Sequence, residues 1–337
     1  MKEVAVLAVD AGGTWCRAAL CSREGQMLGF AQGGSCNFHS IGIEKATSTL
    51  ALVLSSLINK QTLQVSCAVF ALAGLDTKRD RNVLTSIVHN ALSAAHITAN
   101  RIYLDNDAML TLKGSVGLNN GVIIAAGTGS IACGIAQGGQ EVRVGGWGYR
   151  AGDEGSGYSI GKAAVTHILR AYDGRERPSG ISTAVLSKMS FVDEDELVNW
   201  VYSPEYSVQQ IAALASVIVR LAEEGDQQAM KIIKNVGQEL EEMVLTAVGK
   251  LGLFDVPFKL VMSGGILQNP IILQQFIELI KDKCPGAQLA VCKEQPICAI
   301  AKYGFMLMGI HNEEILIRLS KQIDNQSMNA QIISILK

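Results

Sequence analysis

The chain has 337 residues, 29 basic and 31 acidic, for a formal net charge of −2, and 48% of its residues are hydrophobic. This length predicts two domains, each large enough to bury its own core. Aromatic residues are only 5% and no basic block occurs, which argues against a nucleic-acid-binding surface. No apolar stretch reaches the roughly 20 uninterrupted residues of a membrane span, and the N-terminus lacks the features of a signal peptide. We therefore expect a cytoplasmic protein.

Eight cysteines and five histidines are scattered along the chain without the spacing of a metal site. No C-x-x-C pair occurs, and most of the cysteines stand in apolar segments, where a free cysteine behaves as a small hydrophobic residue. We therefore expect no disulfides and no structural zinc or iron–sulfur site.

The chain opens on a strand, glycine turn, strand, turn, strand pattern. Apolar runs over residues 4–9, 17–21 and 27–31 flank the turn D-A-G-G-T (residues 10–14) and a second turn at 23–25. Glycines in the first turn let backbone N–H groups approach phosphate oxygens, because no Cβ blocks the path. The adjacent carboxylate of Asp10 could hold Mg²⁺, usually through water. A hairpin turn with an aspartate as its local cap is the alternative.

Alternating helices and strands follow in the first half. Asn37 lies in a loop and could donate to a sugar hydroxyl, although an ordinary loop asparagine is the alternative. We expect helices over residues 43–57 and 79–95 and strands over 65–73 and 102–104, the latter ending in Asp105-Asn106-Asp107 before a helix opens at 108–113. A carboxylate there can take or orient the proton of a hydroxyl that attacks phosphorus. We select Asp107, with Asp105 as competitor and a helix N-cap as the alternative role.

The opening pattern recurs in the second half. Apolar runs over residues 122–125, 131–136 and 141–144 flank the turn A-G-T-G-S (residues 126–130), and the turn signal N-N-G precedes them. A tight hairpin alone is the alternative, but the recurrence favours phosphate binding, since two such turns can hold a polyphosphate from two sides. We predict a domain over residues 1–115, a second over 116–310 and a helical tail over 311–337.

A glycine-dense segment follows the second pattern. Asp153 and Glu154 lie among glycines before an expected helix over residues 158–171. They could bond the hydroxyls of a polar substrate, or simply place favourable charge in a first helical turn. Residues 180–250 are helix-rich. A strand over 259–262 precedes Gly264 and Gly265, where bare backbone could contact a purine; a strand-to-helix turn is the alternative. A helix over 271–281, a strand over 288–292 and a helix over 299–309 complete the pattern.

The order of these motifs resembles the actin-like sugar kinase and Hsp70 ATPase superfamily. It runs D-A-G-G-T, N-D, G-T-G-S, G-G-W-G…G-D-E-G-S and S-G-G, and the string over residues 145–157 is the most specific part. Within that superfamily the chain resembles the BadF/BadG/BcrA/BcrD group, which includes N-acetylglucosamine kinase, up to about residue 310. The resemblance implies an α/β fold of two ribonuclease-H-like domains with ATP and sugar in the cleft between them.

The resemblance also implies roles for single residues. Asp107 matches the catalytic base, and Asp10 stands where the first phosphate motif would hold Mg²⁺. The ATP-binding motifs match at Gly12, Gly13, Thr14, Thr128 and Gly129 for the phosphates and at Gly264 and Gly265 for adenosine. The amino-sugar positions match at Asn37, Gly145, Gly146 and Asp153.

Two positions depart from the family pattern. Ala11 stands where many relatives have glycine, and Ser159 stands where relatives often have a tryptophan, which leaves a more open wall near Gly157. One branch of the group activates dehydratases through an iron–sulfur cluster held by exposed thiolates. No cysteine lies between residues 136 and 283, which argues against that branch.

We predict an ATP- and Mg²⁺-dependent kinase of carbohydrate metabolism that phosphorylates an amino sugar. We expect the phosphoryl group to go to the 6-hydroxyl. The acceptor is N-acetylglucosamine or a close relative such as N-acetylmuramic acid or glucosamine. The expected partner is this small sugar, with no nucleic acid and no membrane, and a homodimer is a family expectation. The alternatives are an ATPase that activates a partner protein and a non-catalytic sugar sensor.

Overall fold

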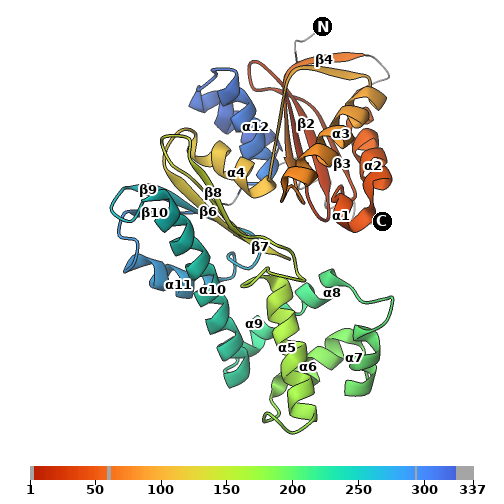
Figure 1. Ribbon diagram of the computed structural model, residues 1–337, viewed down its shortest axis with the longest axis vertical. Coiled ribbons are helices and arrows are strands. Elements are labelled where there is room, and N and C mark those ends of the chain that lie inside the picture. The colour runs from red at the N-terminus through yellow and green to blue at the C-terminus, as the bar shows by residue number, and fades with distance from the viewer. Residues whose placement is uncertain (1–3, 59–61, 293, 324–337) are drawn as a thin grey trace. The chain divides into compact units, whose positions relative to one another are not determined.

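The computed structural model describes residues 4–58, 62–292 and 294–323 (Figure 1). Its contacts divide the chain into two compact units. The first unit contains the chain up to Asn119 together with the segment that follows Cys292, and the second is Asn120–Cys292. The chain therefore returns to its first unit after completing the second. The sequence predicts a boundary between the two domains at residue 115 and the end of the second domain at residue 310. Both stay predictions.

The first unit is built on a mixed five-stranded sheet. Its strands, in the order β3-β2-β1-β4-β5, are β1 (Val4–Ala11), β2 (Cys16–Ser22), β3 (Met27–Gly33), β4 (Leu63–Leu72) and β5 (Ile97–Asp105). The first three strands are antiparallel, whereas β4 and β5 run parallel to β1. All eight residues of β1 are buried, as expected of a central strand that is covered on both faces.

The second unit repeats this plan. Its strands, in the order β10-β9-β6-β7-β8, are β6 (Gly121–Ala126), β7 (Ser130–Ile135), β8 (Glu141–Gly145), β9 (Phe258–Ser263) and β10 (Ala287–Val291). Read from β8, the order and the strand directions match those of the first sheet. The repeat predicted from the sequence and the α/β fold class with two ribonuclease-H-like units are confirmed.

Helices cover both faces of the first sheet. The helices of this unit are α1 (Phe38–Ile41), α2 (Ile43–Ser55), α3 (Lys78–Ala94), α4 (Asp107–Val116), α12 (Pro296–Leu307) and a helix over 313–323. Leu7 and Val9 of β1 join a core with α2 and α3, while Val6 and Ala8 join a core with α12 and the 313–323 helix. Successive strand side chains point to opposite faces, so one strand contributes to both cores.

The second unit is richer in helices. They are α5 (Gly157–Tyr172), α6 (Gly180–Met189), α7 (Glu194–Val201), α8 (Val208–Ala213), α9 (Ala215–Glu223), α10 (Gln227–Leu251) and α11 (Pro270–Lys281). The long helix α10 packs on strands β6, β7 and β8 and also contacts α5, α9 and α11. Helix α10 therefore connects the sheet with α5, α9 and α11 (Figure 1). No helix in the described part of the chain is both long and apolar enough to cross a bilayer.

The sequence pattern predicts a strand β5 that is shorter than the one in the structure. It predicts a strand from residue 102, but the strand begins at Ile97. Thr98, Asn100 and Arg101 interrupt the apolar pattern, because β5 is an edge strand and these three of its nine residues are exposed. The predicted tail helix is present over residues 313–323, with Leu316, Leu319 and Ile323 buried, and the rest of the predicted tail lies outside the described residues.

Candidate functional site

Acidic residues gather at the carboxyl edge of the first sheet. In the strand register Asp10 of β1 stands opposite Ala71 of β4, and Ala71 stands opposite Asp105 of β5. Adjacent strands lie about 4.8 Å apart, so the backbones of Asp10 and Asp105 are separated by about 10 Å. Asp107 begins α4 two residues after Asp105, and its charge acts on the carboxyl of Asp10. Parallel strand ends thus assemble residues that are about a hundred positions apart in the sequence.

Asp10 is a buried carboxyl in an unfavourable electrostatic environment. Only 7% of the residue is exposed, and burial, together with the smaller effect of the charge of Asp107, raises its pKa from 3.8 to about 7. Arg17 lowers the pKa, but its guanidinium is 3.7 Å from the nearer carboxylate oxygen. A divalent cation would offset the repulsion between the two acids, and carboxylates are the ligands that Mg²⁺ prefers. The residues present therefore fit such an ion.

The hydrogen bonds around α4 separate the roles of its neighbouring acids. Lys113 donates to the Asp105 carboxylate at 2.7 Å, and the other carboxylate oxygen accepts from the backbone N–H of Asn106 at 2.9 Å. Asn106 is the N-cap, and its side chain accepts from the N–H groups of Ala108 and Met109. The N-cap alternative for Asp107 is therefore wrong. Both carboxylate oxygens of Asp105 therefore accept hydrogen bonds from residues of the α4 segment. Asp107 lies in the first turn of this helix.

The first glycine turn presents exposed backbone. The N–H of Gly12 donates to the carbonyl of Trp15 at 2.9 Å and closes the hairpin. Gly13 and Thr14 at its tip are exposed, and a Cβ added at Gly13 would meet no atom within 4 Å. The tip is therefore open to a ligand such as a phosphate group.

Asn37 lies beside the end of β4 in the same unit. It caps α1, with its side-chain oxygen accepting from the N–H of His39 at 3.1 Å. Gly74, which follows β4 with φ +83°, packs so closely that a Cβ there would lie 2.9 Å from this oxygen. The amide oxygen is thus fixed by the fold, and the amide nitrogen is the group that Asn37 can offer to a ligand.

The second glycine turn is bound to the start of α5. The N–H of Gly157 donates to the carbonyl of Gly127 at 2.8 Å, and that of Tyr158 donates to the carbonyl of Thr128 at 3.2 Å. Within the turn the N–H of Gly127 donates to the carbonyl of Gly129 at 2.8 Å. Backbone bonds from a helix therefore fix the shape of this turn before any ligand arrives.

Asp153 packs against the same turn. It is buried and adopts φ +64°, a left-handed conformation that costs a non-glycine residue about 1 kcal/mol. Its carboxylate accepts from the N–H of Ser130 at 3.4 Å, and a Cβ added at Gly129 would lie 2.9 Å from the carboxylate. The sequence identified Asp153 through its neighbouring glycines, but its contact with a turn more than 20 residues earlier is visible only in the fold.

Gly264 and Gly265 lie at the end of the neighbouring parallel strand. Ser263 of β9 stands opposite Ala125 of β6, so this motif and the second turn share one edge of the sheet. Gly264 has φ +93°, and a Cβ there would lie 2.2 Å from the carbonyl oxygen of Ala126. Gly265 is exposed and a Cβ there would meet no atom within 4 Å. The fold therefore requires glycine at position 264, whereas the backbone of Gly265 is accessible to a ligand.

Arg143 is a residue of this region that the sequence analysis missed. Its guanidinium donates to the carbonyls of Gly145, at 3.2 Å, and of Gly146, and it lies over the ring of Trp147 at 4.8 Å. Gly145 and Gly146 both have positive φ, so Arg143 holds their unusual backbone in place. An arginine two residues before a glycine pair was the available signal.

The predicted site residues divide between the two units. The first unit holds Asp10, Gly12, Gly13, Thr14, Asn37 and Asp107, and the second holds Thr128, Gly129, Gly145, Gly146, Asp153, Gly264 and Gly265. The proposed acid chemistry thus belongs to the first unit. The second unit supplies mainly backbone groups.

Comparison with known proteins places these motifs in a family. The model of the BadF/BadG/BcrA/BcrD ATPase family matches residues 7–298. The N-acetyl-D-glucosamine kinase of Dictyostelium discoideum is 28% identical over 86% of this chain and 94% of its own length. The N-acetylmuramic acid/N-acetylglucosamine kinase of Clostridium acetobutylicum is 27% identical over 78% and 86%. A crystal structure from Chromobacterium violaceum, described as a candidate N-acetylglucosamine kinase, superposes with a TM-score of 0.71 at 25% identity over 90% of this chain and 100% of that one.

Proposed function

Because the chain belongs to the BadF/BadG/BcrA/BcrD ATPase family, we propose that it is an ATP-dependent amino-sugar kinase. The acceptor is N-acetylglucosamine or a close relative, and the phosphoryl group goes to its 6-hydroxyl. The two curated relatives described above are named as kinases of N-acetylglucosamine, and one of them also of N-acetylmuramic acid. The observation that supports the chemistry most strongly is the pair Asp10 and Asp107 beside the open Gly12–Thr14 turn.

Asp107 acts as the general base in this proposal. The sugar hydroxyl oxygen attacks the γ-phosphorus, the bond from that phosphorus to the bridging oxygen of ADP breaks, and the hydroxyl proton passes to Asp107. Its place in the first turn of α4, where its charge raises the pKa of the buried Asp10 carboxyl, supports this role. Asp105 and Lys113 fix the start of the helix on which Asp107 stands.

Asp10 would hold Mg²⁺ through water, and the bound ion would neutralise charge on the transferring phosphates. The raised pKa of Asp10 supports this assignment, because a buried carboxyl beside a second acid gains stability from a nearby cation. The exposed backbone of Gly12, Gly13 and Thr14 would contact phosphate oxygens.

The second unit would hold the nucleotide and part of the sugar. Thr128 and Gly129 would contact phosphates, and Gly264 and Gly265 would contact adenosine. Gly145, Gly146 and Asp153 would bind the sugar together with Asn37 of the first unit. Backbone groups fixed before binding lose little conformational freedom on binding, which favours affinity.

A panel of amino sugars tests this proposal. Purified protein is incubated with ATP, Mg²⁺ and glucosamine, N-acetylglucosamine or N-acetylmuramic acid, ADP release is followed by a coupled assay, and NMR locates the phosphate. We expect sugar-dependent ADP release and a 6-phosphate product. ATP hydrolysis at one rate with and without every sugar would instead favour the partner-activating ATPase.

We also propose that the enzyme works in the cytoplasm, where ATP is available, and as a homodimer. Light scattering after size-exclusion chromatography measures the mass of the assembly, and a mass near the 35.9 kDa of one chain would contradict the dimer.

A further inference from the structure

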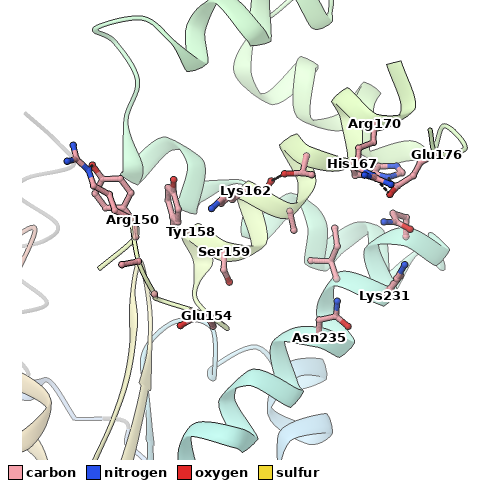
Figure 2. Close-up of a pocket in the computed structure, with 17 residues that line it drawn as sticks. Arg150, Glu154, Tyr158, Ser159, Lys162, His167, Arg170, Glu176, Lys231 and Asn235 are labelled. Atoms are coloured by element: carbon pink, nitrogen blue, oxygen red, sulfur yellow. Dashed lines mark hydrogen bonds and ion pairs between the residues drawn. The ribbon is translucent and has the colours of Figure 1, made fainter. Parts of the chain in front are cut away.

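His39 and His167 each lie beside a carboxylate, but their surroundings differ. His167 of α5 lines a pocket of about 510 Å³ in the second unit (Figure 2). Its Nδ1 lies 2.7 Å from the Glu176 carboxylate and its Nε2 lies 3.0 Å from the Ser179 hydroxyl. Glu176 also accepts from Arg170 at 2.5 Å. Both ring nitrogens of His167 therefore have partners within the protein, and neither is left for a metal ion.

His39 belongs to a different kind of cluster, in the first unit. It lies in α1, whereas Asp76 lies in the loop after β4 and Asp80 in the first turn of α3. One ligand atom from each of the three residues lies within 4.8 Å of the other two. Three separate segments thus bring together one imidazole and two carboxylates. Imidazole nitrogens and carboxylate oxygens are common ligands of divalent transition metals.

One pair of atoms in this cluster has the spacing of two ligands on the same ion. Nε2 of His39 lies 3.3 Å from Oδ1 of Asp80. Two ligands of a tetrahedral Zn²⁺, each about 2.0–2.2 Å from the ion, are separated by about 3.3–3.6 Å. Within the described part of the chain no hydrogen bond joins these two atoms. Their separation therefore suits a shared metal ion.

The Asp80 carboxylate is oriented by the fold before any ion binds. Its side chain is only 8% exposed. Its Oδ2 accepts from the backbone N–H and from the hydroxyl of Thr77, each at 2.8 Å, and these bonds belong to a capping box at the start of α3. Oδ1 is thus the oxygen that faces His39. Carboxylates that bind metal ions are typically held by outer hydrogen bonds of this kind.

The imidazole of His39 is accessible to an ion and is packed against its own loop. Its side chain is 48% exposed, and its ring centroid lies 4.0 Å from that of Phe38. A Cβ added at Gly74 would lie 2.9 Å from Cδ2 of His39 and 2.9 Å from Oδ1 of Asn37. The close approach of Gly74 therefore fixes the histidine ring and the Asn37 amide together.

We propose that His39, Asp76 and Asp80 bind one divalent transition-metal ion, for which Zn²⁺ best matches the spacing, and that this ion positions Asn37. Oδ1 of Asn37 accepts from the backbone N–H of His39 at 3.1 Å. An ion on the imidazole would restrict this turn and, with it, the amide nitrogen that Asn37 can offer to a ligand. The metal-binding part of the inference stands on the cluster alone, whereas the effect on sugar affinity rests on the proposed function.

Metal titrations on the full chain test the site. The protein is stripped of metal ions with a chelator, and saturating Mg²⁺ is then added to fill the proposed site at Asp10. Co²⁺ is the optical probe, because tetrahedral Co²⁺ absorbs visible light, and competition with Zn²⁺ gives the affinity for the second ion. We expect one Co²⁺ to bind per chain and Zn²⁺ to displace it.

Variants of the ligands, with a matched histidine control, locate the binding. His39→Gln and Asp76→Asn leave the capping box intact and should each weaken Zn²⁺ binding at least about tenfold. His89→Gln changes an exposed histidine of α3 that lies outside the cluster, and should bind Zn²⁺ as wild type does. Circular dichroism establishes that each variant is folded.

Calorimetry with N-acetylglucosamine tests the positioning of Asn37. In wild type and His89→Gln, Zn²⁺ should lower the dissociation constant of the sugar at least about threefold, and His39→Gln should lose this response.

Several results would overturn the inference. They are no Co²⁺ binding to wild type, equal Zn²⁺ affinity in His39→Gln and His89→Gln, or full Zn²⁺ affinity in Asp76→Asn. If Zn²⁺ binds but the sugar affinity of an active kinase does not change, the ion does not position Asn37. If no amino sugar is bound or phosphorylated but Zn²⁺ binding still requires His39 and Asp76, the metal site stands and the proposed function fails.

Discussion

The two glycine turns occupy equivalent places in sheets of the same strand order, yet they are supported differently. The first is closed by the bond from Gly12 to Trp15, and its tip is exposed. The second is held by two N–H groups of α5 and by the carboxylate of Asp153. Beside the first turn, Asp10 has a pKa of about 7, so its proton can be exchanged near neutral pH. Beside the second, the Asp153 carboxylate bonds to the turn itself.

This difference suggests how one repeated unit came to serve two purposes. The first copy combines an open turn with acids that can hold a cation or accept a proton. The second combines backbone groups whose geometry is set by the fold, which is the arrangement that binds a ligand at low entropic cost. We infer that variants of the first copy change the rate of phosphoryl transfer, whereas variants of the second change nucleotide binding and stability.

The largest expected effect is that of Asp107→Asn. Asparagine keeps the shape of aspartate but cannot accept the proton, so kcat should fall about 10³-fold. The dissociation constant of N-acetylglucosamine, measured by calorimetry, should change less than about threefold. Asp105→Asn is the matched control, two residues earlier in the chain, and should keep kcat within about tenfold of wild type. A larger loss of kcat in Asp105→Asn than in Asp107→Asn would exchange their roles.

Gly264→Ala should follow in magnitude, because its Cβ would lie 2.2 Å from the carbonyl oxygen of Ala126 and φ is +93°. We expect a loss of about 2–4 kcal/mol in the free energy of unfolding, measured by urea denaturation. Gly265→Ala is the control, since its Cβ meets no atom within 4 Å, and should lose less than about 1 kcal/mol while raising the KM for ATP. Equal stability of the two variants would contradict the packing described here.

Asp105→Asn should act on stability. It removes the carboxylate that accepts from Lys113 at 2.7 Å. The Lys113 side chain is only 10% exposed, but it keeps its contact with the ring of Tyr303. Removing one partner of a buried ion pair costs about 3–5 kcal/mol, and the ring contact and the partial exposure of Asp105 at 20% reduce the expected loss to about 2 kcal/mol. Lys113→Met should restore part of this loss in the double variant, and thermal denaturation measures both. If Lys113→Met adds its full destabilisation to that of Asp105→Asn, the ion pair has no net role.

The smallest effect concerns pH and Mg²⁺. Because the pKa of Asp10 is raised from 3.8 to about 7, the native state holds its proton more tightly than the unfolded state. Its contribution to stability therefore decreases as pH rises between about 4 and 7. The same proton competes with Mg²⁺, so the dissociation constant of Mg²⁺ should rise about fivefold from pH 7 to pH 6. Asp10→Asn should bind Mg²⁺ weakly and without this pH dependence, as calorimetry would show. An unchanged wild-type affinity at pH 6 would remove Asp10 from the proposed metal site.

Local patterns were sufficient to predict much of the fold. Buried strands and glycine turns have strong short-range signals, so the two repeated meanders and the class of fold are confirmed. The edge strand β5 was predicted to be too short because Thr98, Asn100 and Arg101 are exposed polar residues that interrupt its apolar pattern. The helices over residues 180–250 were expected, but their boundaries depend on caps such as Ser207 and Asp226.

The long-range parts of the site could not be predicted from the sequence. Asp107 followed from its place after a strand, but its effect on Asp10 depends on three strands lying in register. The bond between Asp153 and Ser130 joins a loop to a turn, and no periodicity records such a contact. These features follow from tertiary packing, which one sequence does not display.

Single-turnover phosphoryl transfer is the measurement that most directly tests the inference that acids of the first unit determine the rate of transfer rather than the binding of ligands. Wild type and Asp107→Asn are each saturated with labelled ATP and N-acetylglucosamine, occupancy of both ligands is measured in the same samples, and the reaction is quenched over time. The account predicts full occupancy in both proteins and transfer that is about 10³-fold slower in the variant. Transfer at the wild-type rate, or a slow rate explained entirely by lost occupancy, would contradict it.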